Sequence, residues 1–409
     1  MTSQTSSAQP DPAPELTFHW FLPPFVDTRY VVGGGPGGKV TTSGNDPVTD
    51  RPVDLRYLTQ LALAAEQNGL DSVLIPVGLW CEDPWVVASS LLSVTDRLKF
   101  LIAVRPGLAT ALKEAQSAAT FQRLSGDRLN LNVVTGGEPV QQDATGDTLD
   151  KPQRYERTAE YLELWKQLWI SPEPVDFHGR HVQVTGARLP VRPDSIPPVF
   201  FSGSSPEALD VARSHADTYL TWGERPDAVG EKLAEVPDAR GGLRVHLIAR
   251  ETSAEAWTAA RALISNVSER DVRAAQQAIA SSESESQRRI AELHDRGAGY
   301  RQNGDVHDLE IHPGLWAGVG LVRGGAGTAF VGSYEEVADL VAEYHGKGVV
   351  DFVLSGYPHL EETYHLGEGV IPALRRRGFA VTNHGGPFGE AAPIPAPVAD
   401  ASFAKERSA

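Results

Sequence analysis

The chain has 409 residues, of which 41% are hydrophobic, so it can bury a full core as one large domain or two ordinary ones. Its 53 acidic and 37 basic residues leave a formal net charge of −16, which argues against nonspecific nucleic-acid binding. The single cysteine excludes an internal disulfide framework and fits a reducing compartment. The N-terminus lacks the basic and apolar regions of a signal peptide, and no apolar run is long enough to span a membrane. These features predict a cytoplasmic globular protein.

Short apolar runs alternate with helical periodicity between two tails rich in Pro, Ala, Ser and Gly, and the tails are expected to be mobile. The tails cover residues 1–15 and 381–409, and residues 16–380 form a single domain. The predicted strands are Leu16–Leu22, Ser72–Pro76, Leu98–Val104, Arg128–Val134, Pro198–Phe201, Thr218–Thr221, Leu243–Ile248 and Asp351–Leu354. Amphipathic helices follow most of them, such as Leu55–Asn68, Arg154–Trp169 and Ala254–Ile264. Eight such units predict a (β/α)8 barrel and disfavour the alternative, a doubly wound open sheet.

A barrel of this kind needs only about 250 residues, so this chain must carry insertions. One is Val31–Asp50, a stretch rich in Gly, Thr and Pro after the first strand. The other runs from about Asn266 to Tyr344, between strands seven and eight, and contains the polar segment SSESESQRR. Active-site lids are drawn from such long segments, and we expect the second insertion to act as one.

The segment Gly314–Phe330, GLWAGVGLVRGGAGTAF, ends that insertion and holds six glycines and one cation, Arg323. Glycine lets backbone approach a flat ligand closely, and a guanidinium presents a planar fork of donors to an oxyanion. On residue types alone, a plain connector with a solvent-facing arginine explains the segment equally well.

Polar residues stand where a barrel places its working groups, at the carboxyl ends of strands. Asn132 closes the fourth predicted strand, and Arg244 and His246 share one face of the seventh. A buried charged pair is costly unless it is used or paired, although His246 can also be a satisfied core histidine. The segment FFSGSSPEA, with Ser204 and Ser205, opens a helix whose free amides suit a phosphate, and an ordinary capped helix would look the same.

Dinucleotide and P-loop fingerprints are missing. No GxGxxG follows the first strand, and VVGGGPGGKVTT fails the P-loop spacing because Val40 follows Lys39. We also expect no metal site. A nicotinamide cofactor is therefore expected to act on a separate reductase.

The motifs LWAGVGLVRGGAGTAF and SGYPHLEETY, the latter at Ser355–Tyr364, resemble those of the flavin-dependent alkanesulfonate monooxygenases in the bacterial-luciferase-like superfamily. The similarity runs from about Phe18 to about Pro372. It implies a homodimer or homotetramer that takes reduced FMN from an NAD(P)H-dependent flavin reductase. It also implies that FMN and O2 convert an organosulfonate to an aldehyde and sulfite.

The resemblance also implies roles for individual residues. Arg244 and His246 would handle protons, Tyr357 would orient the sulfonate, and Arg323 would stabilise the oxygenated flavin and close the lid. Cys81 would lie on the substrate side of the flavin, although a free cysteine is more often a small buried hydrophobe. Residues implied to bind the cofactor are Pro76, Val77, Asn132, Arg154, Tyr155, Ser204 and Ser205. From sequence alone, Arg154 and Tyr155 suit a surface cation and a core tyrosine equally well.

Two departures from the family pattern bear on the substrate. The first strand continues as WFLPPFVD, so Phe25 stands where a histidine is common, and Val31–Asp50 is longer than the usual segment. Alternatives therefore remain open: a methanesulfonate or dimethylsulfone monooxygenase, a deazaflavin-dependent oxidoreductase on the same barrel, or a flavin-binding barrel without turnover.

Overall fold

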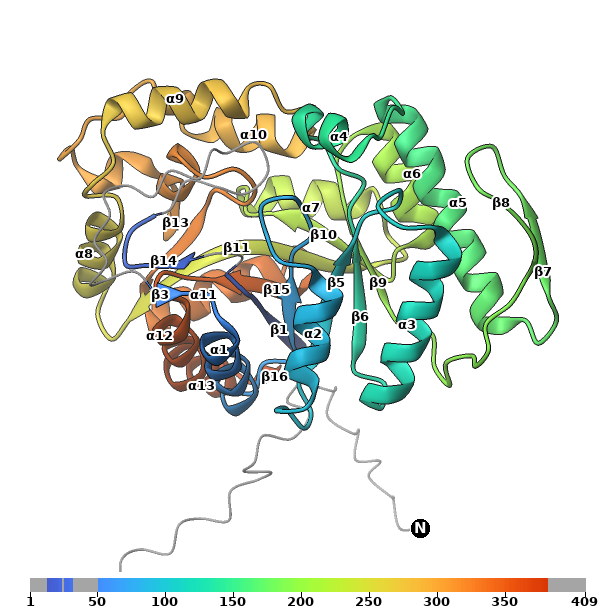
Figure 1. Ribbon diagram of the computed structural model, residues 1–409. Helices are drawn as coiled ribbons and strands as arrows, with labels where there is room; N and C mark the ends of the chain where they lie inside the picture. The colour runs from blue at the N-terminus through green and yellow to red at the C-terminus, as the bar shows by residue number, and fades with distance from the viewer. Residues whose placement is uncertain (1–12, 24–25, 32–50, 382–409) are drawn as a thin grey trace, which may run out of the picture.

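A closed barrel of parallel strands forms the centre of the computed structural model, which describes residues 13–23, 26–31 and 51–381. Its strands are β1 (Glu15–Phe21), β4 (Ser72–Ile75), β5 (Lys99–Val104), β6 (Leu129–Val133), β9 (Val199–Ser202), β10 (Thr218–Trp222), β11 (Arg240–Arg250) and β15 (Val349–Ser355). The first strand pairs in parallel with both β4 and β15, which closes the ring. The predicted (β/α)8 barrel is thus confirmed (Figure 1).

Helices surround the barrel because each presents an apolar face to the strands (Figure 1). The surrounding helices are α1 (Leu55–Gln67), α2 (Pro84–Leu92), α3 (Ala111–Ser125), α5 (Lys151–Ile170), α6 (Pro206–His215), α7 (Pro226–Ala234), α8 (Ser253–Leu263), α11 (Tyr334–His345), α12 (His359–Tyr364) and α13 (Ile371–Arg376). The starts of several are fixed by side-chain caps, such as Asp54 on α1 and the Asp150–Gln153 capping box on α5. The strands are buried on both faces, so the core runs through the barrel and under the helices.

The insertion between β11 and β15 covers the carboxyl ends of the strands with short elements (Figure 1). They are α9 (Glu269–Ile279), α10 (Glu285–Leu293), the 3-10 turns at 295–297, 306–309 and 318–321, β12 (Glu310–His312), β13 (Leu315–Trp316) and β14 (Ala329–Ser333). The long strand β11 pairs with β10 through its first half and with β14 through its second half. Helix α11 lies inside the range expected for the insertion, yet it packs against α7 and α13 as part of the helical ring.

Small elements complete the described chain. They are β2 (Val26–Asp27) paired with β3 (Arg51–Pro52), the hairpin of β7 (Val175–His178) and β8 (Gln183–Ala187), α4 (Pro139–Thr145), the π-helical turn at 365–370, and β16 (Ala380–Val381) beside β1. Nearly all of the two predicted tails, Phe25 and most of Val31–Asp50 lie outside the described residues. Within the described ranges, no helix is long and apolar enough to cross a membrane.

Candidate active site

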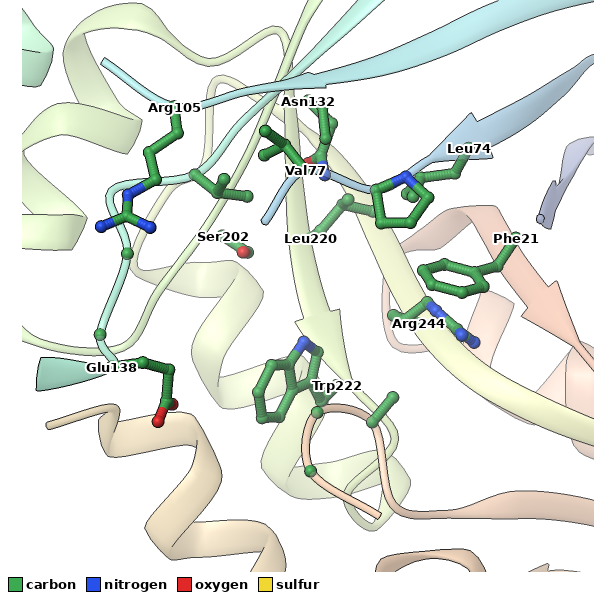
Figure 2. Close-up of a pocket in the computed structure, with 18 of the residues that line it drawn as sticks. Phe21, Leu74, Val77, Arg105, Asn132, Glu138, Ser202, Leu220, Trp222 and Arg244 are labelled. Atoms are coloured by element: carbon green, nitrogen blue, oxygen red, sulfur yellow. The ribbon is translucent and has the colours of Figure 1, made fainter. Parts of the chain in front are cut away.

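A cavity of about 200 Å³ opens at the carboxyl ends of the barrel strands, and we call it the central cavity (Figure 2). Side chains at or near strand ends form its walls: Phe21 on β1, Leu74 on β4, Asn132 on β6, Ser202 on β9, Leu220 and Trp222 on β10, and Arg244 on β11. The loop after β13 contributes Arg323, Gly324, Gly325 and Ala326. The walls are mainly apolar. On the β11 side, their charged groups are the guanidiniums of Arg244 and Arg323.

These two arginines are buried without a carboxylate partner. Arg244 and Arg323 are 8% and 6% exposed, and within the described residues neither forms an ion pair. Arg244 donates to Val245 O and Ser355 Oγ, each at 2.9 Å, and burial together with the charge of Arg323 lowers the pKa of Arg244 to about 9. Both guanidiniums lie over the Phe21 ring, whose centroid is 4.7 Å from the Arg244 Cζ and 5.8 Å from the Arg323 Cζ. Buried cations without counter-charges favour an anionic ligand.

His246 links three segments behind Arg244. The Ser355 hydroxyl lies 2.8 Å from His246 Nδ1, and His246 Nε2 lies 3.1 Å from the carbonyl oxygen of Ala326. Because Arg244 also donates to Ser355, one hydroxyl joins both side chains of the predicted pair. Burial and the two arginine charges hold the pKa of His246 well below its usual value, so the ring is neutral. In this arrangement His246 donates to the loop of Arg323 and accepts from Ser355.

Tyr357 stacks on the His246 ring with centroids 5.6 Å apart. It follows β15 and also contacts His359 edge to face. The backbone of this turn is held by Asp27, whose carboxylate accepts the His359 N–H at 2.8 Å and the hydroxyl of Tyr57. Asp27 is fully buried, and burial raises its pKa to about 6.

The raised pKa of Asp27 predicts a pH-dependent stability. Since the folded pKa of about 6 exceeds the ordinary aspartate value of 3.8, the stabilising contribution of Asp27 is present below pH 4 and is lost as pH rises through 6. That loss is of order 3 kcal/mol, at about 1.4 kcal/mol per pKa unit. Asp27→Asn should therefore lose less stability than wild type between pH 4 and 7, as measured by urea unfolding. Asp238→Asn, at an exposed carboxylate, is the control, and equal pH profiles for all three proteins would contradict this expectation.

A second cavity of about 160 Å³ continues from the central cavity toward α6, and we call it the phosphate cleft. The two share Gly136, Gly137, Glu138, Ser202 and Trp222 among their lining residues. The N-terminus of α6 faces the cleft, where Ser205 caps the helix by accepting the Ala208 N–H. Gly203 before it has φ of +146°, and a Cβ there would lie 2.5 Å from Ala208 Cβ, so only glycine fits this turn. Amides at such a helix start suit a phosphate.

Two buried polar atoms in these cavities have no hydrogen-bond partner among the described residues. Asn132 Oδ1 lines the central cavity and Thr135 Oγ1 lines the cleft, and their residues are 8% and 7% exposed. A buried polar atom without a partner is rare, and here a ligand can supply one. A flat polar ring in the central cavity with a phosphate arm in the cleft would satisfy both. The residues present therefore fit FMN.

The predicted site residues fall into three groups. Arg244, Arg323, Pro76, Val77 and Asn132 line the central cavity, and Tyr155, Ser204 and Ser205 line the cleft. His246, Tyr357, Cys81 and Arg154 line neither cavity. Of these, His246 and Tyr357 pack directly behind the two arginines.

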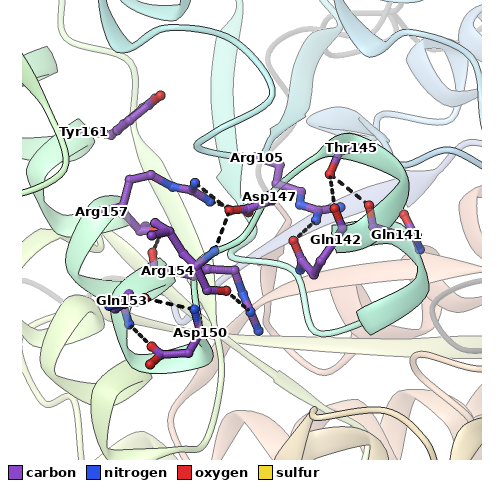
Figure 3. A network of polar contacts seen from close by, with 12 residues as sticks. Arg105, Gln141, Gln142, Thr145, Asp147, Asp150, Gln153, Arg154, Arg157 and Tyr161 are labelled. Atoms are coloured by element: carbon purple, nitrogen blue, oxygen red, sulfur yellow. Dashed lines mark hydrogen bonds and ion pairs between the residues drawn. The ribbon is translucent and has the colours of Figure 1, made fainter.

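Cys81 and Arg154 are engaged with the protein itself. Cys81 Sγ lies 3.4 Å from the carbonyl oxygens of Pro76 and Gly78, and burial raises the pKa of the thiol to about 12, so it stays protonated. Arg154 is 3% exposed and donates to Leu149 O at 2.8 Å and to Glu283 at 2.5 Å. It belongs to the polar network of Figure 3, in which Arg157 donates to Asp147 through its two terminal nitrogens, Nη1 and Nη2.

The sequence reading missed several cavity residues. Phe21, Ser202 and Trp222 end their strands, and Arg105 directly follows β5 (Figure 2). The same rule that selected Asn132 would have found them, since each stands at the carboxyl end of a barrel strand. Ser355 at the end of β15 was missed for another reason. A serine gives no sequence signal for the bridge it makes between Arg244 and His246.

The fold and this site define a (β/α)8-barrel protein with two buried arginines in a cavity at the carboxyl ends of its strands. The family model described as luciferase-like monooxygenase matches residues 16–351, and the chain belongs to this family. It is thus an oxidoreductase of the luciferase-like monooxygenase type.

Solved structures share the fold at low identity. A riboflavin lyase with modified FMN and the substrate riboflavin matches with a TM-score of 0.72 at 20% identity, over 91% of this chain and 94% of that one. An EDTA monooxygenase from Chelativorans sp. BNC1 matches with a TM-score of 0.65 at 18% identity, over 89% and 94%. An F420-dependent secondary alcohol dehydrogenase, in complex with an F420-acetone adduct, matches with a TM-score of 0.58 at 18% identity, over 88% and 99%. Two of these other proteins thus bind a modified FMN and an F420 adduct on barrels of the same fold.

Proposed function

We propose that the protein is a reduced-FMN-dependent monooxygenase that removes sulfite from an organosulfonate, using O2 and leaving an aldehyde. The observation that carries the proposal is the pair Arg244 and Arg323, which is buried in a cavity with mainly apolar walls and forms no ion pair within the described residues. A sulfonate head would neutralise the two cations, and its organic tail would contact side chains such as Leu74, Leu220 and Trp222. A neutral sulfone would leave both charges uncompensated, and methanesulfonate would leave the apolar wall unfilled.

The protein side of the mechanism follows from these contacts. Bound reduced FMN would supply the oxygen-activating chemistry, with its ring against Asn132 and its phosphate at Ser204 and Ser205. Arg244 and Arg323 bind and orient the anion, and the apolar walls exclude water around it. The neutral His246, held by Ser355, keeps both Arg244 and the Arg323 loop in place. Tyr357 offers its hydroxyl next to these groups, and burial keeps its pKa above the usual value.

A panel of sulfonates tests the substrate class. With a flavin reductase, NADH and FMN, the protein should release sulfite from alkanesulfonates with an apolar tail and much less from methanesulfonate. Dimethylsulfone should not be turned over. The same assay with reduced F420 in place of the FMN system separates the two cofactors found on this barrel. Turnover with F420 alone, or a preference for dimethylsulfone, would contradict the proposal.

The isolated chain should not oxidise nicotinamides, because its sequence carries no dinucleotide fingerprint. We expect NADH and NADPH absorbance to stay constant with protein and FMN, and to fall only when a separate reductase is added. Rapid NADH consumption by the chain and FMN alone would show that it reduces its own flavin. The reductase partner, a cytoplasmic location and a homo-oligomeric state belong to the same proposal.

A further inference from the structure

The N-termini of two helices from different parts of the chain face each other across the phosphate cleft. Helix α6 belongs to the barrel, whereas α10 belongs to the insertion, and its first turn contributes Ser284, Glu285 and Ser286 to the cleft lining. The hydroxyls of Ser204 and Ser286 lie 3.3 Å apart. N–H groups in the first turn of a helix lack intrahelical acceptors, so both helix starts offer donors to one ligand.

The segment before α10 is attached to the loop after β6. The Glu283 N–H donates to Gly137 O at 3.0 Å, and the Ser282 hydroxyl donates to Glu138 Oε1 at 2.8 Å. The Glu283 carboxylate pairs with Arg154 at 2.5 Å. These contacts hold the first turn of α10 over the cleft.

The charges in the cleft suit an anion. Of its three carboxyl groups, Glu283 pairs with Arg154, Glu285 pairs with Arg288, and Glu138 has a pKa raised by burial. Lys151 adds a cation to the lining. The hydroxyl of Thr135 is buried without a protein partner, as described above, and it can donate to a phosphate oxygen.

The same turn of α10 contacts the loop that carries Arg323. Gln287 is 2% exposed, and its Oε1 accepts the N–H of Gly325 at 2.6 Å. One turn further on, Ile290 packs on Gly327, where a Cβ would come within 2.6 Å of the Ile290 side chain. Ser286, which lines the cleft, is therefore the direct sequence neighbour of Gln287, which positions Gly325.

We propose that the first turn of α10 is the second wall of the phosphate cleft and transmits the presence of a phosphate monoester there to the loop that carries Arg323. The inference rests on the proposed function for the identity of the cofactor. A bound phosphate fixes Ser286 and the α10 start, and Gln287 then holds Gly325 and its neighbours. A flavin without the phosphate would occupy the central cavity but leave this turn held only by protein contacts, such as those with Arg154 and with the loop after β6.

Binding of oxidised FMN and riboflavin, measured by fluorescence quenching, tests whether the first turn of α10 recognises the phosphate. Wild type should bind FMN at least about tenfold more tightly than riboflavin, the size expected for hydrogen bonds to a charged group. Ser286→Ala should reduce this ratio severalfold without changing riboflavin affinity. Ser281→Ala is the matched control, because Ser281 is exposed in the same segment and its hydroxyl donates to Ala278 O, and it should behave as wild type. Inorganic phosphate should compete with FMN in wild type and less in Ser286→Ala.

The outcomes separate this proposal from the function it rests on. The first turn of α10 does not recognise the phosphate if FMN and riboflavin bind equally well. The same conclusion follows if Ser286→Ala lowers the affinity for both flavins alike. The flavin-dependent function would survive that result. If neither flavin binds, the cofactor assignment itself is wrong and the proposal falls with it.

Hydrogen exchange of the backbone amides of residues 323–327 tests whether phosphate binding is transmitted to the loop that carries Arg323. FMN should slow exchange there more than riboflavin does in wild type. Gln287→Met, which removes the acceptor for Gly325 at similar size, should abolish that difference, and Gln287→Glu, which keeps an acceptor oxygen, should retain most of it. Equal protection by FMN in wild type and Gln287→Met would overturn the coupling.

Discussion

Replacing Arg323 with alanine is expected to stop sulfite release while hydrogen peroxide still forms from the reduced flavin and oxygen. The guanidinium is 6% exposed, faces the central cavity and has no carboxylate partner within the described residues, so its charge is available only to a ligand. Loss of one such donor typically lowers turnover by about 10²–10³-fold. Arg323→Lys keeps the charge but loses the planar fork, so it should rescue only part of the rate.

The decisive measurement is sulfite and hydrogen peroxide formed per reduced FMN consumed. Arg296→Ala is the control, because Arg296 lies in the same insertion with its side chain 59% exposed. It should couple flavin oxidation to sulfite as wild type does. If Arg323→Ala also does so, Gly314–Phe330 is only a connector.

Substitution of Arg244 by methionine should chiefly weaken sulfonate binding. Arg244 and Arg323 are the two buried cations on the β11 side of the cavity. Removing one member of a buried charged contact costs about 2–5 kcal/mol, or roughly 30-fold to several thousand-fold in affinity. We expect kcat/KM for the sulfonate to fall by at least about 100-fold on this basis, mainly through KM. FMN affinity should change little, since the phosphate cleft lies on other strands.

Arg240→Met is the matched control for Arg244→Met. Arg240 begins the same strand at the opposite end of the barrel, where it pairs with Asp351 at 3.0 Å. Arg240→Met therefore shows how far loss of a β11 arginine disturbs the barrel when the residue does not line the central cavity. A normal KM in Arg244→Met, or an equal defect in Arg240→Met, would remove Arg244 from the anion site.

The glycines of Gly314–Phe330 show which part of a structural role can be predicted from residue type alone. The sequence suggested a loop that approaches a flat ligand, and Gly324 and Gly325 do line the central cavity. Gly320 and Gly327 serve the fold instead, because their backbones cross so closely that a Cβ on Gly327 would lie 2.7 Å from Gly320 Cα. Composition cannot separate these two uses, since both require the absence of a side chain.

The sequence by itself determined the barrel, because eight apolar runs each followed by helical periodicity leave few other ways to bury both faces of the strands. It also selected Asn132 by its place at a strand end, Arg244 by the strand face it shares with His246, and Ser204 by its place before a helix start. Only the tertiary structure showed that Arg323 and Arg244 both lie over the Phe21 ring, that Ser355 links Arg244 to His246, and that Arg154 pairs with Glu283 of the cleft lining. These contacts join residues distant in the chain, and their geometry depends on how the insertion folds back over the barrel, which no local pattern encodes.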